Sequence, residues 1–227
     1  MPATPVFSSS LPADSLAGYV ERLLANHLPD GIDPGYDLTP HVATALERVE
    51  HSFSNIHRKY YEHQGSIAFD HLNGDHMAAF LYLLGNSAWA ATGDSVTPTK
   101  LFYLNKVMHA LDLYFSVALP EIFLLVHPVG SVIGNAHYGD YFVVYQNCTI
   151  GADNGIYPHF GEGTVLYSRS SVLGNCTVGD NVVFAANSFV VNHDVPADSI
   201  VVGQYPSQRA LPNPTTVRER IFDPASA

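Results

Sequence analysis

Apolar residues recur every six positions along the C-terminal half of the chain. They stand at Val126, Val132, Tyr138, Val144 and Ile150 and, after a slip of four residues, at Phe160, Leu166, Val172, Val178, Phe184 and Val190. The residue four positions after each is mostly small. Neither the 3.6-residue helical period nor simple strand alternation produces this spacing. It is typical of a β-helix built from hexapeptide repeats, in which the apolar side chains point into a narrow prism.

The first half of the chain shows helical spacing instead. Its apolar residues predict helices over 15–28, from 39 to about 61, over about 74–91 and from 100 to about 117. The fold class is therefore α+β, with a helical domain over 1–120, a β-helix over 121–202 and a C-terminal tail over 203–227. An open β-helix end exposes unpaired strand edges. We expect the helical domain to cover one end and the tail to wrap back along the outside.

Composition narrows the function classes. The chain carries 10 basic and 21 acidic residues, a net charge of −11, so the basic stripe that nucleic-acid binding needs is missing. No signal-peptide pattern or membrane-length apolar run is seen, and we expect no membrane partner and a soluble, cytoplasmic protein. The two cysteines, Cys148 and Cys176, fall on small inward positions of the repeat, and we expect reduced thiols in the core.

Three segments carry a family resemblance. Residues 103–106 (YLNK) with 109–111 (HAL), residues 127–134 (HPVGSVIG) and residues 146–151 (QNCTIG) are similar to successive motifs of one family. Residues 158–163 parallel the next motif. On these segments the chain resembles the serine acetyltransferases and their sugar O-acetyltransferase relatives, within the left-handed β-helix hexapeptide acyltransferases.

The resemblance implies a fold and an activity. A left-handed parallel β-helix would carry an O-acetyltransferase that uses acetyl-CoA as the acyl donor and needs no metal. These proteins are normally trimers with sites between subunits, and in the serine acetyltransferase branch hexamers also occur. The expected partners are therefore acetyl-CoA, a small-molecule acceptor and further copies of the chain.

The resemblance also assigns residues on the acceptor side. His127 matches the family's general base. Val126 stands where the family has an aspartate, and Tyr157 stands where it has a second histidine, with His159 two residues on. Asp94 is the nearest match to the serine-binding aspartate. These departures favour a sugar or sugar nucleotide, as in surface-polysaccharide assembly, over L-serine.

Acyl transfer from a thioester to a hydroxyl sets its own requirements. A histidine suits proton removal because its pKa lies near working pH, and a backbone N–H at a coil corner suits the oxyanion. We take His127 and His159 as the catalytic candidates, with His137 next. Tyr157 and Gln146 join Asp94 as substrate-binding candidates. The orienting partner of His127 stays open between Glu121, Asp140, a backbone carbonyl and none.

Binding of the acyl donor is expected at the far end of the β-helix. Residues 203–207 (GQYPS) loosely parallel the family's CoA loop, so Gly203 and Pro206 would form a turn against the adenine ring. Gly151 and Arg209 complete the candidate set for acetyl-CoA. Arg218 and Arg220 could also meet the CoA phosphates.

Three other functions remain open. The first is an N-acyltransferase acting on an amino-sugar with the same base and groove. The second is a γ-type carbonic anhydrase, which shares the β-helix but needs histidine spacings that 127, 137, 159 and 193 do not offer. The third is an inactive scaffold, which the residue Val126 favours and the retained His127-Pro128 opposes.

Overall fold

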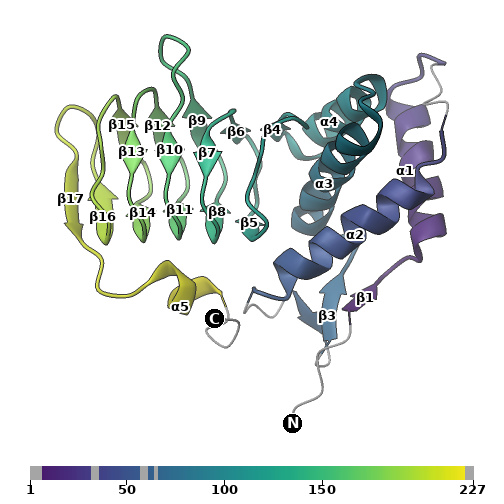
Figure 1. Ribbon diagram of the computed structural model, residues 1–227, viewed down its shortest axis with the longest axis horizontal. Coiled ribbons are helices and arrows are strands. Elements are labelled where there is room, and N and C mark those ends of the chain that lie inside the picture. The colour runs from purple at the N-terminus through teal and green to yellow at the C-terminus, as the bar shows by residue number, and fades with distance from the viewer. Residues whose placement is uncertain (1–6, 32–35, 57–60, 64–65, 223–227) are drawn as a thin grey trace.

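The N-terminal part is helical, as predicted. The computed structural model describes residues 7–31, 36–56, 61–63 and 66–222. Four helices, α1 (Ala13–His27), α2 (Thr39–Phe53), α3 (Gly74–Thr92) and α4 (Val96–His109), pack beside a small sheet of β1 (Phe7–Ser9), β2 (Glu62–His63) and β3 (Ser66–Phe69). Helix α3 is apolar on all sides and lies at the centre, in contact with α2 and α4 (Figure 1). None of the described helices is long and apolar enough to cross a membrane.

Two helix predictions need correction at their ends. The second helix ends at Phe53 and not near residue 61; the predicted stretch over 57–60 lies outside the described residues. The fourth begins at Val96 and ends at His109, because Ala110 adopts a left-handed conformation (φ 53°) that caps it. The next strand, Asp112–Leu113, already pairs in parallel with Val132–Ile133. The first coil of the β-helix therefore starts before residue 120.

The C-terminal part is a parallel β-solenoid, which matches the predicted left-handed β-helix. Its three faces have the strand orders β4-β6-β9-β12-β15, β5-β8-β11-β14-β16 and β7-β10-β13. The strands are β4 (Asp112–Leu113), β5 (Phe123–Leu125), β6 (Val132–Ile133), β7 (His137–Tyr138), β8 (Phe142–Val144), β9 (Thr149–Gly151), β10 (His159–Phe160), β11 (Thr164–Leu166), β12 (Ser171–Leu173), β13 (Thr177–Val178), β14 (Val182–Phe184), β15 (Phe189–Val191), β16 (Ser199–Val202) and β17 (Arg209–Pro212).

The prism interior holds the predicted apolar positions from Tyr138 onward. Their side chains are buried in every later coil, and Phe142, Phe160 and Phe184 fill its centre. Cys148 and Cys176 are buried free thiols, as predicted, and burial raises the pKa of both. Since the thiolate is the reactive form of cysteine, neither thiol is suited to covalent chemistry.

The first coil departs from the predicted phase. Leu125 and Ile133 point inward, pairing with Val144 and Ile150, whereas the predicted inward residue Val132 is 41% exposed. Eight residues separate Leu125 from Ile133, while six separate Val144 from Ile150. The first corner is therefore two residues longer than the one above it.

The tail runs back along the outside, as expected. Strand β17 pairs antiparallel with β16, and the short helix α5 (Val217–Ile221) lies against the solenoid (Figure 1). Asn181 Oδ1 accepts the Val217 N–H at 3.0 Å, and the Phe222 ring lies 5.2 Å from that of Tyr141. Phe222 also forms a bridge with Ile56 after α2. The tail thus ties the outer coils to the helical part.

Candidate active site

His127 stands on the long first corner. Its backbone is left-handed (φ 46°), and its imidazole side chain is 75% exposed. Its Nδ1 atom lies 3.3 Å from Oδ2 of Asp75. The Nδ1 side of the exposed ring therefore faces a carboxylate, and the Nε2 atom lies on the other side of the ring.

Asp75 lies in the first turn of α3. The side chain of Asn73 caps this helix, accepting the Asp75 N–H at 3.0 Å. A carboxylate is favoured here by the positive end of the helix dipole. Asp75 was not among the expected partners of His127. Of those, Asp140 accepts the backbone N–H of Ile122 at 3.2 Å, and among the described residues Glu121 forms no ion pair.

The helical part therefore places a carboxylate beside His127, where the solenoid itself has Val126. The signal for Asp75 in the sequence was weak. An acidic residue in a first helical turn is common, and nothing local links it to a histidine that follows it by 52 residues.

Gln146 lies on the corresponding corner of the next coil. The Asn147 N–H donates to the Val129 carbonyl at 2.9 Å, so the corner with Gln146 lies directly on the corner with His127. The Gln146 Oε1 atom is buried and has no hydrogen-bond partner in the described part of the chain. Buried polar atoms are rarely left in this state. The corner beside that of His127 thus holds a buried amide oxygen without a hydrogen-bond partner among the described residues.

The loop that breaks the repeat is short and well anchored. Asp153 and Ile156 exchange two backbone hydrogen bonds of 3.0 Å around a turn at Asn154 and Gly155. Beyond it, the Tyr157 ring packs on Gly134, where an added Cβ would lie 2.8 Å from the ring. Tyr157 is 40% exposed, so it forms part of the outer surface next to the loop.

His159 follows this loop and pairs with His137 one coil below. The two rings stack with centroids 3.9 Å apart and planes 4° apart. Both side chains are exposed. Within the described residues, no hydrogen bond or ion pair joins either histidine to His127. His159 therefore stays a prediction as a catalytic residue.

Asp94 has a structural task in this chain. Its carboxylate accepts the N–H groups of Val96 and Thr97 at the start of α4, and the first of these bonds is the main cause of its lowered pKa. Asp94 lies just after the C-terminal end of α3, whereas Asp75 lies in the first turn of that helix. A helix of 19 residues is about 29 Å long. The structure does not bring Asp94 to His127 within one chain.

The donor-binding candidates lie elsewhere on the solenoid. Gly151 ends β9 just before the loop. Gly203 (φ 87°), Pro206 and Arg209 belong to the last coil and to β17, and Arg209 is exposed. With a strand spacing of about 4.8 Å, four coil steps place the last corner about 19 Å from the first.

Arg218 and Arg220 are engaged in the tail. The Arg218 guanidinium lies 4.6 Å from the centre of the Tyr141 ring, and Arg220 donates to Asn213 Oδ1 at 3.1 Å. They hold α5 in place, which leaves Arg209 as the better candidate for a phosphate.

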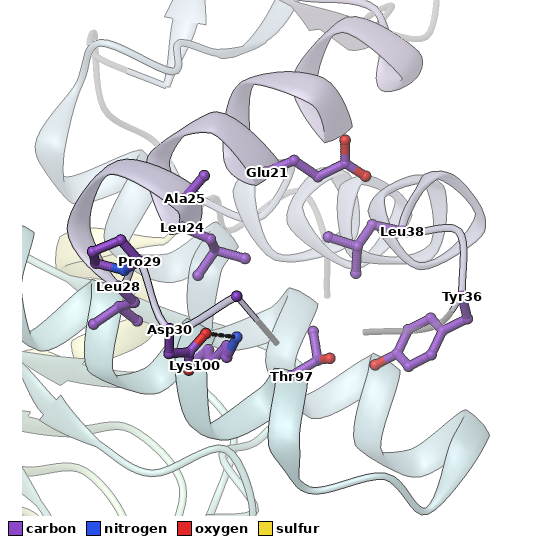
Figure 2. Close-up of a pocket in the computed structure, with 11 residues that line it drawn as sticks. Glu21, Leu24, Ala25, Leu28, Pro29, Asp30, Tyr36, Leu38, Thr97 and Lys100 are labelled. Atoms are coloured by element: carbon purple, nitrogen blue, oxygen red, sulfur yellow. Dashed lines mark hydrogen bonds and ion pairs between the residues drawn. The ribbon is translucent and has the colours of Figure 1, made fainter. Parts of the chain in front are cut away.

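A cavity of about 610 Å³ opens in the helical part, between α1 and the start of α4 (Figure 2). Its wall combines apolar residues with an ion pair of 2.6 Å between Lys100 and Asp30. None of the candidate site residues lines it. No group of three or more possible metal ligands occurs among the described residues.

The sequence is similar to known proteins over part of its length. No family model matches the chain. It is 34% identical over 113 residues to the serine acetyltransferase of Synechococcus elongatus, a match covering 48% of this chain and 46% of that protein. It is 39% identical over 82 residues to the enzyme of Staphylococcus xylosus, covering 34% and 38%. The chain thus spans about half the length of the curated relatives it matches.

Solved structures share the fold over most of the chain. The serine acetyltransferase of Vibrio cholerae superposes with a TM-score of 0.68 at 22% identity, covering 90% of this chain and 83% of that one. A serine acetyltransferase in complex with CoA gives 0.65 at 19% identity, covering 86% and 85%. The Neisseria gonorrhoeae enzyme in complex with serine gives 0.66 at 22% identity, covering 89% and 84%. The chain resembles serine acetyltransferases in sequence and has their fold.

Proposed function

We propose that the chain is an acetyl-CoA-dependent O-acetyltransferase with His127 as the general base. The observation that carries the proposal is the exposed His127 imidazole with its Nδ1 atom 3.3 Å from Asp75. The sequence relatives and a fold shared with a CoA complex support acetyl-CoA as the donor.

The proposed reaction needs no covalent enzyme intermediate. With Nδ1 facing Asp75, the His127 Nε2 atom takes the proton of the acceptor hydroxyl as its oxygen attacks the thioester carbon. The tetrahedral intermediate then breaks its carbon–sulfur bond, and the CoA sulfur takes the proton from His127. The products are the O-acetyl ester and free CoA. Asp75 stabilises the imidazolium that forms between the two steps.

The finer assignments are part of the proposal. Gly151, Gly203, Pro206 and Arg209 would contact the donor. Gln146 and Tyr157 would line the acceptor side. A sugar or sugar-nucleotide hydroxyl is the proposed acceptor, because Val126 and Tyr157 replace the aspartate and histidine of the resembled family. L-serine, which a structure neighbour binds, is the competing acceptor. Cytoplasmic localisation stays a prediction.

A homotrimer is the proposed assembly, with a hexamer as the alternative. The exposed apolar residues Val129 (55%) and Val132 (41%) beside His127 support a contact with another copy at this corner. Light scattering of the purified protein tests this, since a monomer at micromolar concentration contradicts it.

The activity is tested by following free CoA release from acetyl-CoA with a panel of L-serine, glucose, glucosamine and a uridine-diphosphate sugar. Wild type should release CoA with at least one hydroxyl acceptor and His127→Ala should not. Modification of the glucosamine nitrogen alone would favour the N-acyltransferase. Acetyl-CoA binding without turnover on any acceptor, or no binding at all, would favour the scaffold.

A further inference from the structure

A second histidine, His109, lies beside Asp75 at the end of α4. An ideal Cβ added to Gly74 would lie 3.8 Å from the His109 Cδ2 atom, so the imidazole sits against the first residue of α3. The Asp75 charge acts on His109. The carbonyl of Ala110 accepts the Gly130 N–H at 3.0 Å, which fixes this helix end against the first corner. His109, Asp75 and His127 thus come from three elements that meet at one place.

Hydrogen bonds determine which nitrogen of His109 carries the proton. The Asn105 side chain is buried, and its Nδ2 donates to the Ala78 carbonyl at 2.9 Å. Its Oδ1 atom therefore faces His109 and accepts from Nδ1 at 2.7 Å. In a neutral ring, Nε2 then holds the lone pair. No hydrogen bond within the described part of the chain uses Nε2.

The surroundings of His109 also favour the neutral form of its imidazole. Burial is the larger effect and lowers the pKa of His109 from its ordinary value of 6.5, while the Asp75 charge acts in the other direction. At neutral pH the group is an acceptor held in fixed orientation by Asn105, beside a carboxylate.

We propose that His109 is a further substrate-contacting residue, whose Nε2 accepts a hydrogen bond from a second hydroxyl or amino group beside the acetylated hydroxyl. This inference rests on the proposed function. It narrows the acceptor class to vicinal diols, as in sugars, and vicinal amino alcohols, as in serine.

The chemistry points to the acceptor and not to the donor. The thioester end of acetyl-CoA offers a carbonyl oxygen and a sulfur but no polar hydrogen to a lone pair. An acceptor with two adjacent donor groups could give one proton to His127 and one hydrogen bond to His109. The neighbouring Asp75 carboxylate favours donor-rich or cationic groups over anionic ones.

Two variants separate the acceptor function from a structural role. In His109→Asn the amide nitrogen takes the place of Nδ1 and keeps the bond to Asn105, but nothing replaces Nε2. In His109→Gln the amide group reaches the Nε2 position. We expect His109→Asn to raise the KM of the acceptor about three- to tenfold, the loss of one net hydrogen bond, with the KM of acetyl-CoA unchanged. His109→Gln should restore part of this loss.

Substrate analogues complete the test. Each acceptor that wild type acetylates is compared with the analogue that lacks the hydroxyl or amino group beside the acetylated position, as 3-hydroxypropionate lacks the amino group of L-serine. His109→Asn should penalise the full acceptor and leave its analogue unaffected, while His51→Gln on exposed α2 surface should change neither. An equal penalty on both members of the pair, or none, overturns the inference while leaving the transferase in place. A wild type that turns over no acceptor overturns the proposed function, and this inference with it.

Discussion

Asp75 and His127 are 52 residues apart in the chain, yet Asp75 Oδ2 and His127 Nδ1 lie 3.3 Å apart. One residue opens a helix of the N-terminal part, and the other stands on the first corner of the solenoid. The pair therefore joins the two halves of the chain at the candidate site. It also means that the helical part does more than cover the end of the solenoid.

The Asp75 carboxylate is expected to be required for turnover. In Asp75→Asn the imidazole loses its orienting charge, and kcat/KM should fall about a hundredfold, the cost of a misplaced catalytic group. His127→Ala should lose a factor of about 10² to 10⁴. The double variant should be no worse than His127→Ala, because the two residues act as a unit. Steady-state CoA release measures this, with Asp14→Asn on the exposed face of α1 as the matched control. Wild-type activity in Asp75→Asn would contradict the role.

Much of the solenoid was predictable, because a prism interior demands one apolar residue per face. From Tyr138 onward every predicted apolar position is buried, and the slip of four residues is the loop before His159. The first coil was out of phase, since its corner is two residues longer and moves the inward positions to Leu125 and Ile133. A corner insertion of this kind leaves no local apolar signal.

The candidate site was less predictable. His127 follows from the resemblance, but Asp75 and His109 depend on how α3 and α4 meet the first corner, which repeat spacing does not encode. Asp94 was expected near the acceptor because it is the nearest match to the serine-binding aspartate of the resembled family. In the structure its carboxylate accepts the N–H groups of Val96 and Thr97 at the start of α4, and its contact with a substrate stays a prediction. Tertiary contacts between the two halves decide these roles.

The long corner should be sensitive to substitution at Gly130. Its φ is +75°, and an added Cβ would lie 2.6 Å from Asn147 Oδ1 in the next coil. Gly130→Ala should lower the free energy of unfolding by about 2–3 kcal/mol, from backbone strain and the close contact together. Gly155 also has positive φ (+80°) but no atom within 4 Å. Gly155→Ala should therefore cost only about 1 kcal/mol. Urea denaturation measures both, and equal losses would contradict the crowding at the corner.

The tail should contribute strongly to stability. Phe222 is 1% exposed and contacts Tyr141, so Phe222→Ala should lower the free energy of unfolding by about 3–5 kcal/mol. Leu211 in the tail strand β17 is 42% exposed. Leu211→Ala should therefore change the free energy of unfolding by less than about 1 kcal/mol. Thermal and urea unfolding give the comparison. A Phe222→Ala protein as stable as wild type would show that the tail does not hold the coils.

Stability should depend on pH through His109. Its pKa is lower in the folded protein than the ordinary 6.5, so below about pH 6.5 the unfolded chain binds more protons than the folded one. The contribution of neutral His109 to the free energy of unfolding is therefore fully present above pH 6.5, and it is lost as the pH falls toward the pKa of His109 in the folded protein. Between pH 7.5 and 5.5, wild type should lose more unfolding free energy than His109→Gln. Identical losses in the two proteins would contradict a depressed pKa.

The most direct test of the account is CoA release from acetyl-CoA by wild type and His127→Ala, with L-serine and the sugar panel as acceptors. Intact folding is checked by circular dichroism and acetyl-CoA binding by calorimetry. The account predicts that both proteins bind acetyl-CoA and that only wild type transfers the acetyl group to a hydroxyl. Full activity of His127→Ala would contradict the central role of His127, and failure of wild type to bind acetyl-CoA would contradict the transferase itself.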